Sequence, residues 1–283
     1  LIALSIIPFG PMVSEADASA LYAALGFTDT TGFPTRIPLA IANLNISILF
    51  VFAVTSVGVY GITLAGWSSN NKWSLLGGIR AVAQMVSYEI TMGLAIAGVL
   101  LIAGTLNFYE MIGQQSGGFW NWIVWYQPIG FVLFVTAMFA ETNRLPFDLP
   151  EAESELTGGY HTEYSSMKFA LFFLSEYINM IIVSAVCATL FLGGFSGVLP
   201  LSMIWAGAPG WVGYLLGPAV MLAKILGFVT FFIFIRGVWP RLRYDQLMNL
   251  GWKVLLPLGF LNLALTAVLL AAGAPKIVFF VSG

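Results

Sequence analysis

Carboxylates are concentrated in one short segment of the sequence, residues 141–166. The chain has only 13 acidic residues, and this segment contains Glu141, Asp148, Glu151, Glu153, Glu155 and Glu163. It also contains the only histidine, His161. Closely spaced carboxylates repel one another, so some should have a raised pKa or meet cations from a partner. Groups of this kind can exchange protons when a nearby charge changes.

The backbone of the same segment is expected to be irregular. Pro146 and Pro150 stop a helix and favour extended backbone in the residues before them, and Gly158 with Gly159 permits a tight turn. An ordinary solvated acidic loop would have the same spacing. We favour a functional segment because the rest of the chain is so poor in carboxylates.

The elements around this segment are membrane helices. The chain is 59% hydrophobic and 8% charged, with a mean hydropathy of +0.91, whereas soluble domains have about 25% charged residues. The single cysteine, Cys187, rules out an internal disulfide and a metal site made of several thiolates, and one histidine argues against a metal site. A net charge of −2 gives no basic patch for nucleic acid.

Hydropathy predicts an all-α fold, a polytopic transmembrane helix bundle that forms a single domain over residues 1–283. A spanning helix needs about 20 apolar residues. We expect six complete spans, at residues 40–66, 80–105, 126–142, 165–192, 211–238 and 251–272. Residues 1–9 are interpreted as the outer end of a helix that is truncated at its N-terminal side. Residues 10–39, 67–78 and 143–164 are expected to be loops, and residues 106–125 a partly helical interfacial connector with tryptophans.

The basic residues predict the orientation, because Lys and Arg are enriched in cytoplasmic loops. The ends that carry the acidic loop 143–164 have eight basic residues: Lys72, Arg80, Arg144, Lys168, Arg236, Arg241, Arg243 and Lys253. The opposite ends have Arg36 and Lys276. The acidic loop is therefore expected on the cytoplasmic side, or on the matrix side of a mitochondrial membrane.

Three ionisable residues fall deep inside the predicted spans. From the rise of a helix, Glu89 lies about 14 Å from the nearest cytoplasmic end, Glu176 about 16 Å and Lys224 about 21 Å. The hydrocarbon core is about 30 Å thick, so all three are expected near mid-membrane. They could pair with one another and only fix the packing. We favour a proton relay, because ionisable groups within a membrane are functional by default.

Two further cytoplasmic segments are rich in polar and aromatic residues. Residues 67–80 could be an ordinary loop with interfacial tryptophans, and residues 236–253 a basic anchor of the topology. The alternative for residues 236–253 is a docking surface for a cytoplasmic subunit.

These motifs resemble a known family. Residues 141–156 (ETNRLPFDLPEAESEL) and 158–164 (GGYHTEY) resemble the signature of the quinone-site membrane subunit, the H subunit, of respiratory complex I, NADH:quinone oxidoreductase. Residues 67–80, 241–247 and 251–253 resemble two further signatures of that family. The resemblance covers essentially the whole chain.

The resemblance implies roles for the singled-out residues. The quinone chamber and its acidic funnel would include Arg144, Asp148, Glu151, Glu153, Glu155 and Glu163. A proton relay would continue through Glu89, Glu141 and Glu176, with Lys224 as a counter-charge. Soluble subunits would dock on Lys72, Arg80, Arg241, Arg243 and Asp245.

The resemblance also implies cofactors and partners. Quinone is the expected substrate, and FMN and iron–sulfur clusters are expected on peripheral partner subunits, since this chain lacks ligands for a redox centre. Antiporter-like and small membrane subunits complete the expected partners in a bacterial or mitochondrial inner membrane. Three alternatives stay open: the equivalent subunit of a membrane-bound hydrogenase-type or other complex I-like ion pump, a stand-alone proton or sodium transporter, and a structural anchor.

Overall fold

The computed structural model describes residues 2–14, 36–148, 159–197 and 211–273. The α-helices are α2 (Ser47–Ser68), α3 (Lys72–Ala103), α4 (Phe108–Gln114), α5 (Ile123–Tyr126), α6 (Pro128–Glu141), α8 (Ser166–Phe191), α10 (Trp211–Val238), α11 (Tyr244–Asn249) and α12 (Leu256–Ala271). Three 3-10 helices are η1 (Ala3–Ser5), η2 (Phe119–Asn121) and η3 (Gly159–His161), and a π-helix covers Leu250–Leu255. The strands are β1 (Gly10–Ser14) and β2 (Arg36–Leu39).

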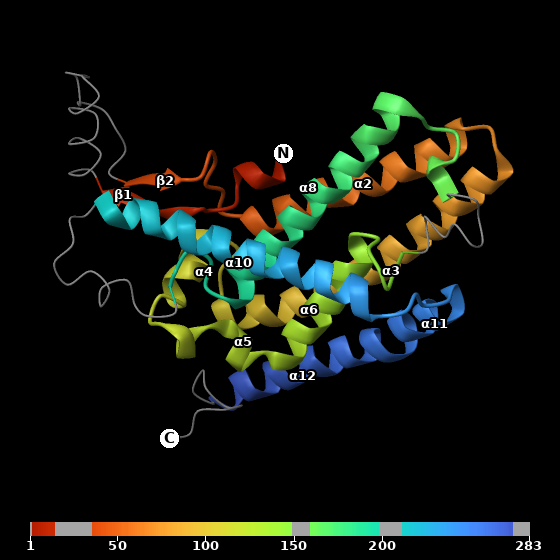
Figure 1. Cartoon of the computed structure of the whole chain (residues 1–283). Coiled ribbons are helices and arrows are strands. Elements are labelled where there is room, and N and C mark those ends of the chain that lie inside the picture. The colour runs from red at the N-terminus through yellow and green to blue at the C-terminus, as the bar shows by residue number, and fades with distance from the viewer. Residues whose placement is uncertain (1, 15–35, 149–158, 198–210, 274–283) are drawn as a thin grey trace, which may run out of the picture.

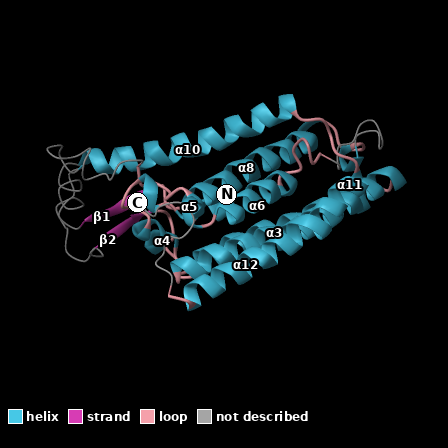
Figure 2. Cartoon of the chain, turned by 90° about the horizontal axis from the view of Figure 1, so that it is seen from below, coloured by secondary structure: helices cyan, strands magenta, loops and turns pink. Residues whose placement is uncertain are grey.

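The long helices form an elongated bundle. The β-strands, α4 and α5 gather at one end of it and α11 at the other (Figure 1). Seen from below, α10 lies along one edge and α12 along the opposite edge, with α3, α6 and α8 between them (Figure 2). The buried apolar core comes mainly from α3, α6 and α8, including Tyr88, Phe134 and Phe191. The central helices are therefore covered by protein on several sides, while α10 and α12 present wide apolar outer faces.

Five helical segments are long and apolar enough to cross a membrane: Ser47–Ser68, Lys72–Ala103, Ser166–Phe191, Leu216–Val238 and Tyr244–Ala271. They correspond to five of the six predicted spans. The third predicted span, 126–142, corresponds to α6, whose 14 residues reach only about 21 Å. The helix end expected at residues 1–9 is not confirmed, because η1 is the only helical turn in the described part of that segment.

Residues 10–39 were expected to be a loop, and this is wrong at both ends of the segment. β1 and β2 pair antiparallel, with Gly10 opposite Leu39 and Ser14 opposite Arg36, and the register shifts between Gly10 and Val13. Each strand has one partner, so Pro11 and Pro38 can be accommodated on edges that need no ladder hydrogen bond. Short strands interrupted by proline have little period-2 signal, which is why hydropathy missed them.

The loop predicted at residues 67–78 is wrong for most of its length. α2 continues to Ser68, and α3 begins at Lys72, where the Asn71 side chain accepts a hydrogen bond from the Trp73 backbone N–H at 3.0 Å. Gly77 and Gly78 lie inside α3 rather than in a turn. A Cβ on Gly78 would lie 3.3 Å from the Cα of Gly66 in α2, so the glycine pair permits close helix packing.

The turn expected at residues 236–253 is much shorter than predicted. α10 ends at Val238, and Pro240 prevents its continuation. A continuous helical segment, Tyr244–Ala271, then begins seven residues before the predicted span. It contains the π-helix, where Gly251 lies against the ring of Tyr88 and a Cβ would approach it at 3.5 Å. The Tyr88 hydroxyl donates to the carbonyl oxygen of Leu247 at 3.0 Å.

The partly helical connector predicted at residues 106–125 contains α4, η2 and α5. Its tryptophans differ in environment. Trp120 is 61% exposed, as expected of an interfacial residue, whereas Trp122 is only 6% exposed. Trp122 thus packs inside the protein, whereas the exposed Trp120 is free to lie at a membrane interface, as we expect for this connector.

The close approach of α3 to η3 generates a prediction. A Cβ on Gly77 would lie 2.9 Å from the Cα of Gly159, and backbone atoms cannot step aside as a flexible side chain can. Gly77→Ala should therefore lower the stability of the protein by about 1–3 kcal/mol. The matched control is Gly93→Ala in the same helix, where a Cβ meets nothing within 4 Å. Thermal unfolding in detergent measures both, and equal midpoints would show that η3 moves without cost.

Candidate functional site

Glu176 of α8 joins the polar segment after α6 to the helix bundle. The Tyr160 hydroxyl donates a hydrogen bond to Glu176 Oε1 at 3.0 Å. Arg144 Nη2 lies 3.3 Å from Glu176 Oε2, and His161 Nε2 lies 3.8 Å from Oε1. The guanidinium of Arg144 also covers the ring of Tyr177 at 4.5 Å. The counter-charge of Glu176 therefore comes from the segment 141–166 itself, whose described ends, residues 141–148 and 159–166, pack against the bundle.

Gln84 of α3 holds the start of this segment. Its side-chain amide is fully buried and donates to the carbonyl oxygens of Ala140 and Phe147, both at 2.8 Å, and to Asn143 Oδ1 at 3.2 Å. A helix end leaves carbonyl groups without partners inside the helix. One buried amide thus caps α6 and fixes the turn that carries Arg144.

The other end of the segment is held by η3. Gly159 adopts a positive φ of 59°, and its backbone lies directly against Gly77. The buried Ser74 hydroxyl donates to the carbonyl oxygen of Tyr160 at 3.2 Å. These contacts place the Tyr160 ring between α3 and α8, where its hydroxyl reaches Glu176.

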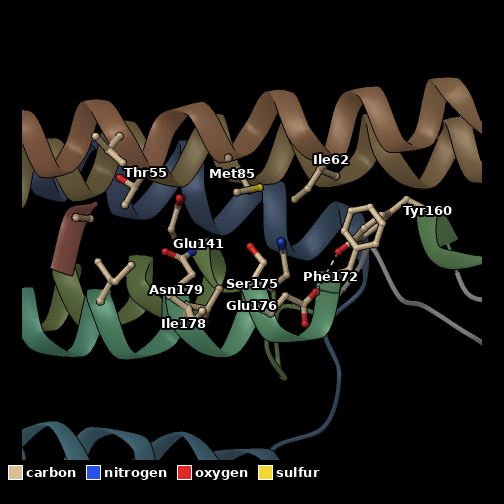
Figure 3. A pocket seen from close by; sticks show the side chains of 16 residues that line it. Thr55, Ile62, Met85, Glu141, Tyr160, Phe172, Ser175, Glu176, Ile178 and Asn179 are labelled. Carbon is tan, nitrogen blue, oxygen red and sulfur yellow. Dashed lines mark hydrogen bonds between the residues drawn. The ribbon is translucent and has the colours of Figure 1, made fainter. Parts of the chain in front are cut away.

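A cavity of about 220 Å³ adjoins this cluster. Figure 3 shows Glu141, Glu176, Ser175 and Asn179 directed toward it from α6 and α8, with Thr55 on α2 opposite. Its polar lining residues are Thr55, Glu141, Thr142, Asn143, Tyr160, Ser175, Glu176 and Asn179. Apolar side chains such as Val54 and Ile182 complete the lining, and a cavity of this size with several polar groups has room for several waters.

Glu141 is the carboxylate most enclosed by protein in this region. It is 3% exposed, and its Oε2 atom has no hydrogen-bond partner. The same residue also borders a small second cavity with Thr55 and Ile182. A buried carboxyl oxygen that faces a cavity is satisfied by water or by its own proton. Glu141 and Glu176 line the same cavity.

Glu89 of α3 lies outside the lining of the larger cavity and has its own partner, the hydroxyl of Ser56 on α2. Thr55, the preceding residue, faces the cavities that Glu141 borders. The adjacent residues Thr55 and Ser56 of α2 thus face two different carboxylates. Thr55 lines cavities with Glu141 of α6, and Ser56 contacts Glu89 of α3.

Comparison with known proteins gives the same family for nearly the whole chain. The sequence model of a family described as NADH dehydrogenase matches residues 2–267. A Koribacter versatilis protein, the second H subunit of its NADH-quinone oxidoreductase, is 46% identical over 273 residues, which are 96% of this chain and 74% of the relative. The H subunit of Protochlamydia amoebophila is 49% identical over 258 residues (91% and 74%), and that of Flavobacterium psychrophilum is 47% identical over 264 residues (92% and 76%). This chain belongs to the NADH dehydrogenase family. The resemblance inferred from the motifs is thereby confirmed.

Within this member of the NADH dehydrogenase family, the predicted pairing of Lys224 with Glu89 or Glu176 is wrong. The Lys224 ammonium donates to the carbonyl oxygens of Leu192 and Ser196 at 2.6 Å and of Gly194 at 2.8 Å. It also lies 4.6 Å from the centre of the Trp122 ring. All three N–H groups are committed to the chain that follows α8, so Lys224 acts as a helix cap at that end of the bundle.

One predicted funnel residue, Asp148, forms an ion pair with one predicted docking residue, Arg241. Arg241 Nη2 lies 2.8 Å from Asp148 Oδ2, and the exposed Glu163 accepts a hydrogen bond from Asn71 at 2.8 Å. The guanidinium of Arg80 covers the ring of Tyr244 at 5.6 Å. The remaining docking candidates, Lys72, Arg243 and Asp245, are exposed. Glu151, Glu153 and Glu155 lie outside the described residues.

The pair between Asp148 and Arg241 has a further consequence. The backbone N–H of Leu242 donates to the carbonyl oxygen of Pro146 at 3.1 Å. The connector after α6 and the connector after α10 therefore lie at the same end of the bundle, as the distribution of basic residues predicted.

Several residues of this site were missed by the sequence reasoning: Ser56, Gln84, Asn179 and Tyr160 as a ligand of Glu176. Polar residues at helical spacing in apolar spans were the available signal, since 175, 176 and 179 fall on one face of α8. Their partners come from other helices, so spacing alone could not identify them.

The contacts of Lys224 predict a structural role. Lys224→Met keeps the length of the side chain but leaves three carbonyl oxygens without their donor, so the free energy of unfolding should fall by about 2 kcal/mol. Lys253→Met, which removes an exposed lysine, is the control. Thermal unfolding of the purified protein measures both. Unchanged stability together with lost proton pumping would instead return Lys224 to the relay.

Proposed function

We propose that this chain is the membrane subunit of an NADH:quinone oxidoreductase and that it couples quinone reduction to proton translocation. The relatives named as the H subunit of NADH-quinone oxidoreductase align with nine-tenths or more of the chain. Membership of the NADH dehydrogenase family favours this reading over a stand-alone transporter and over a purely structural anchor.

The observation that carries the coupling proposal is the position of Glu176. Its carboxylate contacts Arg144 and Tyr160 from the polar segment and also lines the cavity that Glu141 borders. A change of charge in the segment therefore acts directly on a carboxylate within the bundle. No other described carboxylate combines these two sets of contacts.

The proposed steps follow from these contacts. Quinone reduced beside the segment 142–164 takes up electrons, and the growing negative charge attracts the guanidinium of Arg144. Arg144 then neutralises Glu176 less well, and Glu176 gains affinity for a proton. Water in the cavity can bring that proton from Glu141 to Glu176, and Glu89 is the next acidic side chain in the same region. When the charge on the quinone is neutralised, Arg144 returns to Glu176, which then releases the proton.

The remaining assignments belong to this proposal. The quinone chamber and its acidic funnel would be lined by Arg144, Asp148, Glu151, Glu153, Glu155 and Glu163, and the relay would use Glu89, Glu141 and Glu176. Quinone would be the substrate, with FMN and iron–sulfur clusters on peripheral subunits. Those subunits would dock on Lys72, Arg80, Arg241, Arg243 and Asp245, while antiporter-like and small membrane subunits would lie beside the helices.

The finer topology is also a proposal. Residues 1–283 would form one transmembrane domain in a bacterial or mitochondrial inner membrane. α6 would be the sixth span, because its neighbours α3 and α8 bury it and the polar cavity continues past its end.

Cysteine labelling across the membrane tests the crossing of α6. Ser116 and Ser165 are exposed, and α6 is the one apolar helix of ten or more residues in the described part of the chain between them. Ser116→Cys should react with an impermeant reagent from one side of the membrane and Ser165→Cys from the other. The native Cys187 is buried and gives little background. Labelling of both from the same side would mean that α6 does not cross.

Neutralisation of Glu176 tests the coupling. Glu176→Gln keeps the shape of the side chain but removes the exchangeable charge, so the complex should assemble with quinone reduction and proton pumping both depressed. Quinone reductase rate and proton uptake in proteoliposomes are the measurements, on fully assembled material. Glu110→Gln, in the first turn of α4, is the control. Wild-type values for Glu176→Gln would show that Glu176 is only a packing residue. Proton transport by the isolated chain, without partner subunits, would instead favour the stand-alone transporter.

A further inference from the structure

Ser56 has more hydrogen-bond partners than its single hydroxyl hydrogen can serve. Its Oγ atom lies 2.9 Å from the carbonyl oxygen of Phe52 and is also in contact with Oε1 of Glu89. A serine hydroxyl donates one hydrogen and accepts at two lone pairs. Only one of the two oxygens can therefore receive its hydrogen at a time.

The carbonyl oxygen of Phe52 also has more donors within reach than it can accept. It accepts the N–H of the residue four positions later in α2, which is Ser56. The hydroxyls of Thr55 at 3.0 Å and Ser56 at 2.9 Å both reach it too. Three donors face two lone pairs, so one hydroxyl must turn elsewhere. Thr55 has the Val51 carbonyl at 3.2 Å as a second acceptor, and Ser56 has Glu89.

We propose that Ser56 is a positioning residue for Glu89, whose hydroxyl holds the Glu89 carboxyl group in both of its protonation states. This inference rests on the proposed role of Glu89 in proton transfer. With Glu89 ionised, the Ser56 hydroxyl donates to the carboxylate, and Thr55 donates to Phe52. With Glu89 protonated, its O–H donates to Ser56 Oγ, and the Ser56 hydrogen rotates to the carbonyl of Phe52.

The exchange requires only rotation of two hydroxyl groups. No heavy atom moves, and the contact between Ser56 and Glu89, both half-buried, keeps a hydrogen bond in each state. A carboxyl group without such a neighbour would have to change its rotamer or remain unsatisfied in one state. Glu89 can thus gain or lose a proton within the bundle while its orientation toward the other carboxylates is preserved.

The direction of α2 makes this arrangement specific to one residue. Successive side chains of a helix differ in direction by about 100°. Thr55 consequently faces the cavity that Glu141 borders, while Ser56 faces α3 and Glu89. A hydroxyl elsewhere on α2, such as that of Thr63, donates only to the carbonyl of its own helix, Val59 at 2.8 Å.

The test uses the intact complex in proteoliposomes and compares Ser56→Ala, Ser56→Thr and Thr63→Ala. The infrared bands of Glu89 are identified as the difference between the wild-type complex and Glu89→Gln. Ser56→Ala should shift the Glu89 band, toward higher frequency for a protonated carboxyl, and lower proton uptake about tenfold. Ser56→Thr, which keeps the hydroxyl, should restore both, and Thr63→Ala should change neither.

An unshifted Glu89 band in Ser56→Ala would overturn the proposal. If Ser56→Ala does not assemble, Ser56→Cys provides the same comparison, because a thiol is a weak donor and acceptor. A different result would contradict the proposed function. If Ser56→Ala shifts the Glu89 band but Glu89→Gln keeps wild-type proton uptake, Ser56 still positions Glu89, and Glu89 is not part of the relay.

Discussion

Charge within a membrane bundle is expensive unless protein atoms replace the lost water, and this constraint organises the structure. Lys224 is met by three backbone carbonyl oxygens and an indole ring. Glu176 is met by a guanidinium and a phenol hydroxyl, and Glu89 by a serine. Glu141 differs, because one of its oxygens faces a cavity without a protein partner. At Glu141, water can take the place that protein atoms occupy around the other three.

The coupling that we propose requires the polar segment after α6 to be anchored, and its described residues are anchored at several points. Gln84 fixes its beginning, Arg241 pairs with Asp148 near its middle, and Gly77 supports η3 at its end. Two of these anchors come from α3 and the third from the connector after α10. A chemical change in the segment is therefore transmitted to the helices instead of being absorbed by a loose loop.

Composition and hydropathy predicted most of the helices, because lipid requires long apolar runs that few other folds contain. The predicted helix boundaries were less accurate where a residue type, such as glycine, occurs both in turns and at close contacts between helices. Gly77 and Gly78 suggested a turn, but they permit close packing of α3 against α2 and η3. The depth of Lys224 could be counted from the sequence, yet its partners at the end of α8 could not, since they depend on how helices pair.

Glu141 was recognised from the unusual number of carboxylates in its segment, and Glu89 and Glu176 from their depth within apolar spans. Their neutral partners were not recognised, because Ser56 and Tyr160 are ordinary residues in sequence. Hydroxyl groups take on a role only when tertiary packing brings them to an ionisable neighbour. The sequence thus identified the charged members of the site, and the structure supplied the groups that orient them.

The π-helix at Leu250–Leu255 changes the rotational phase of the last membrane helix. A π-turn contains one residue more than an α-turn, so the residues before it are rotated by about 100° relative to a continuous α-helix. This rotation directs the Leu247 carbonyl to Tyr88 and lets Gly251 lie against the same ring. Loss of a single residue here would leave the apolar surface of α12 unchanged and turn α11 away from α3. The alignment of the two ends of this helix is thus set by one extra residue, independently of the lipid around it.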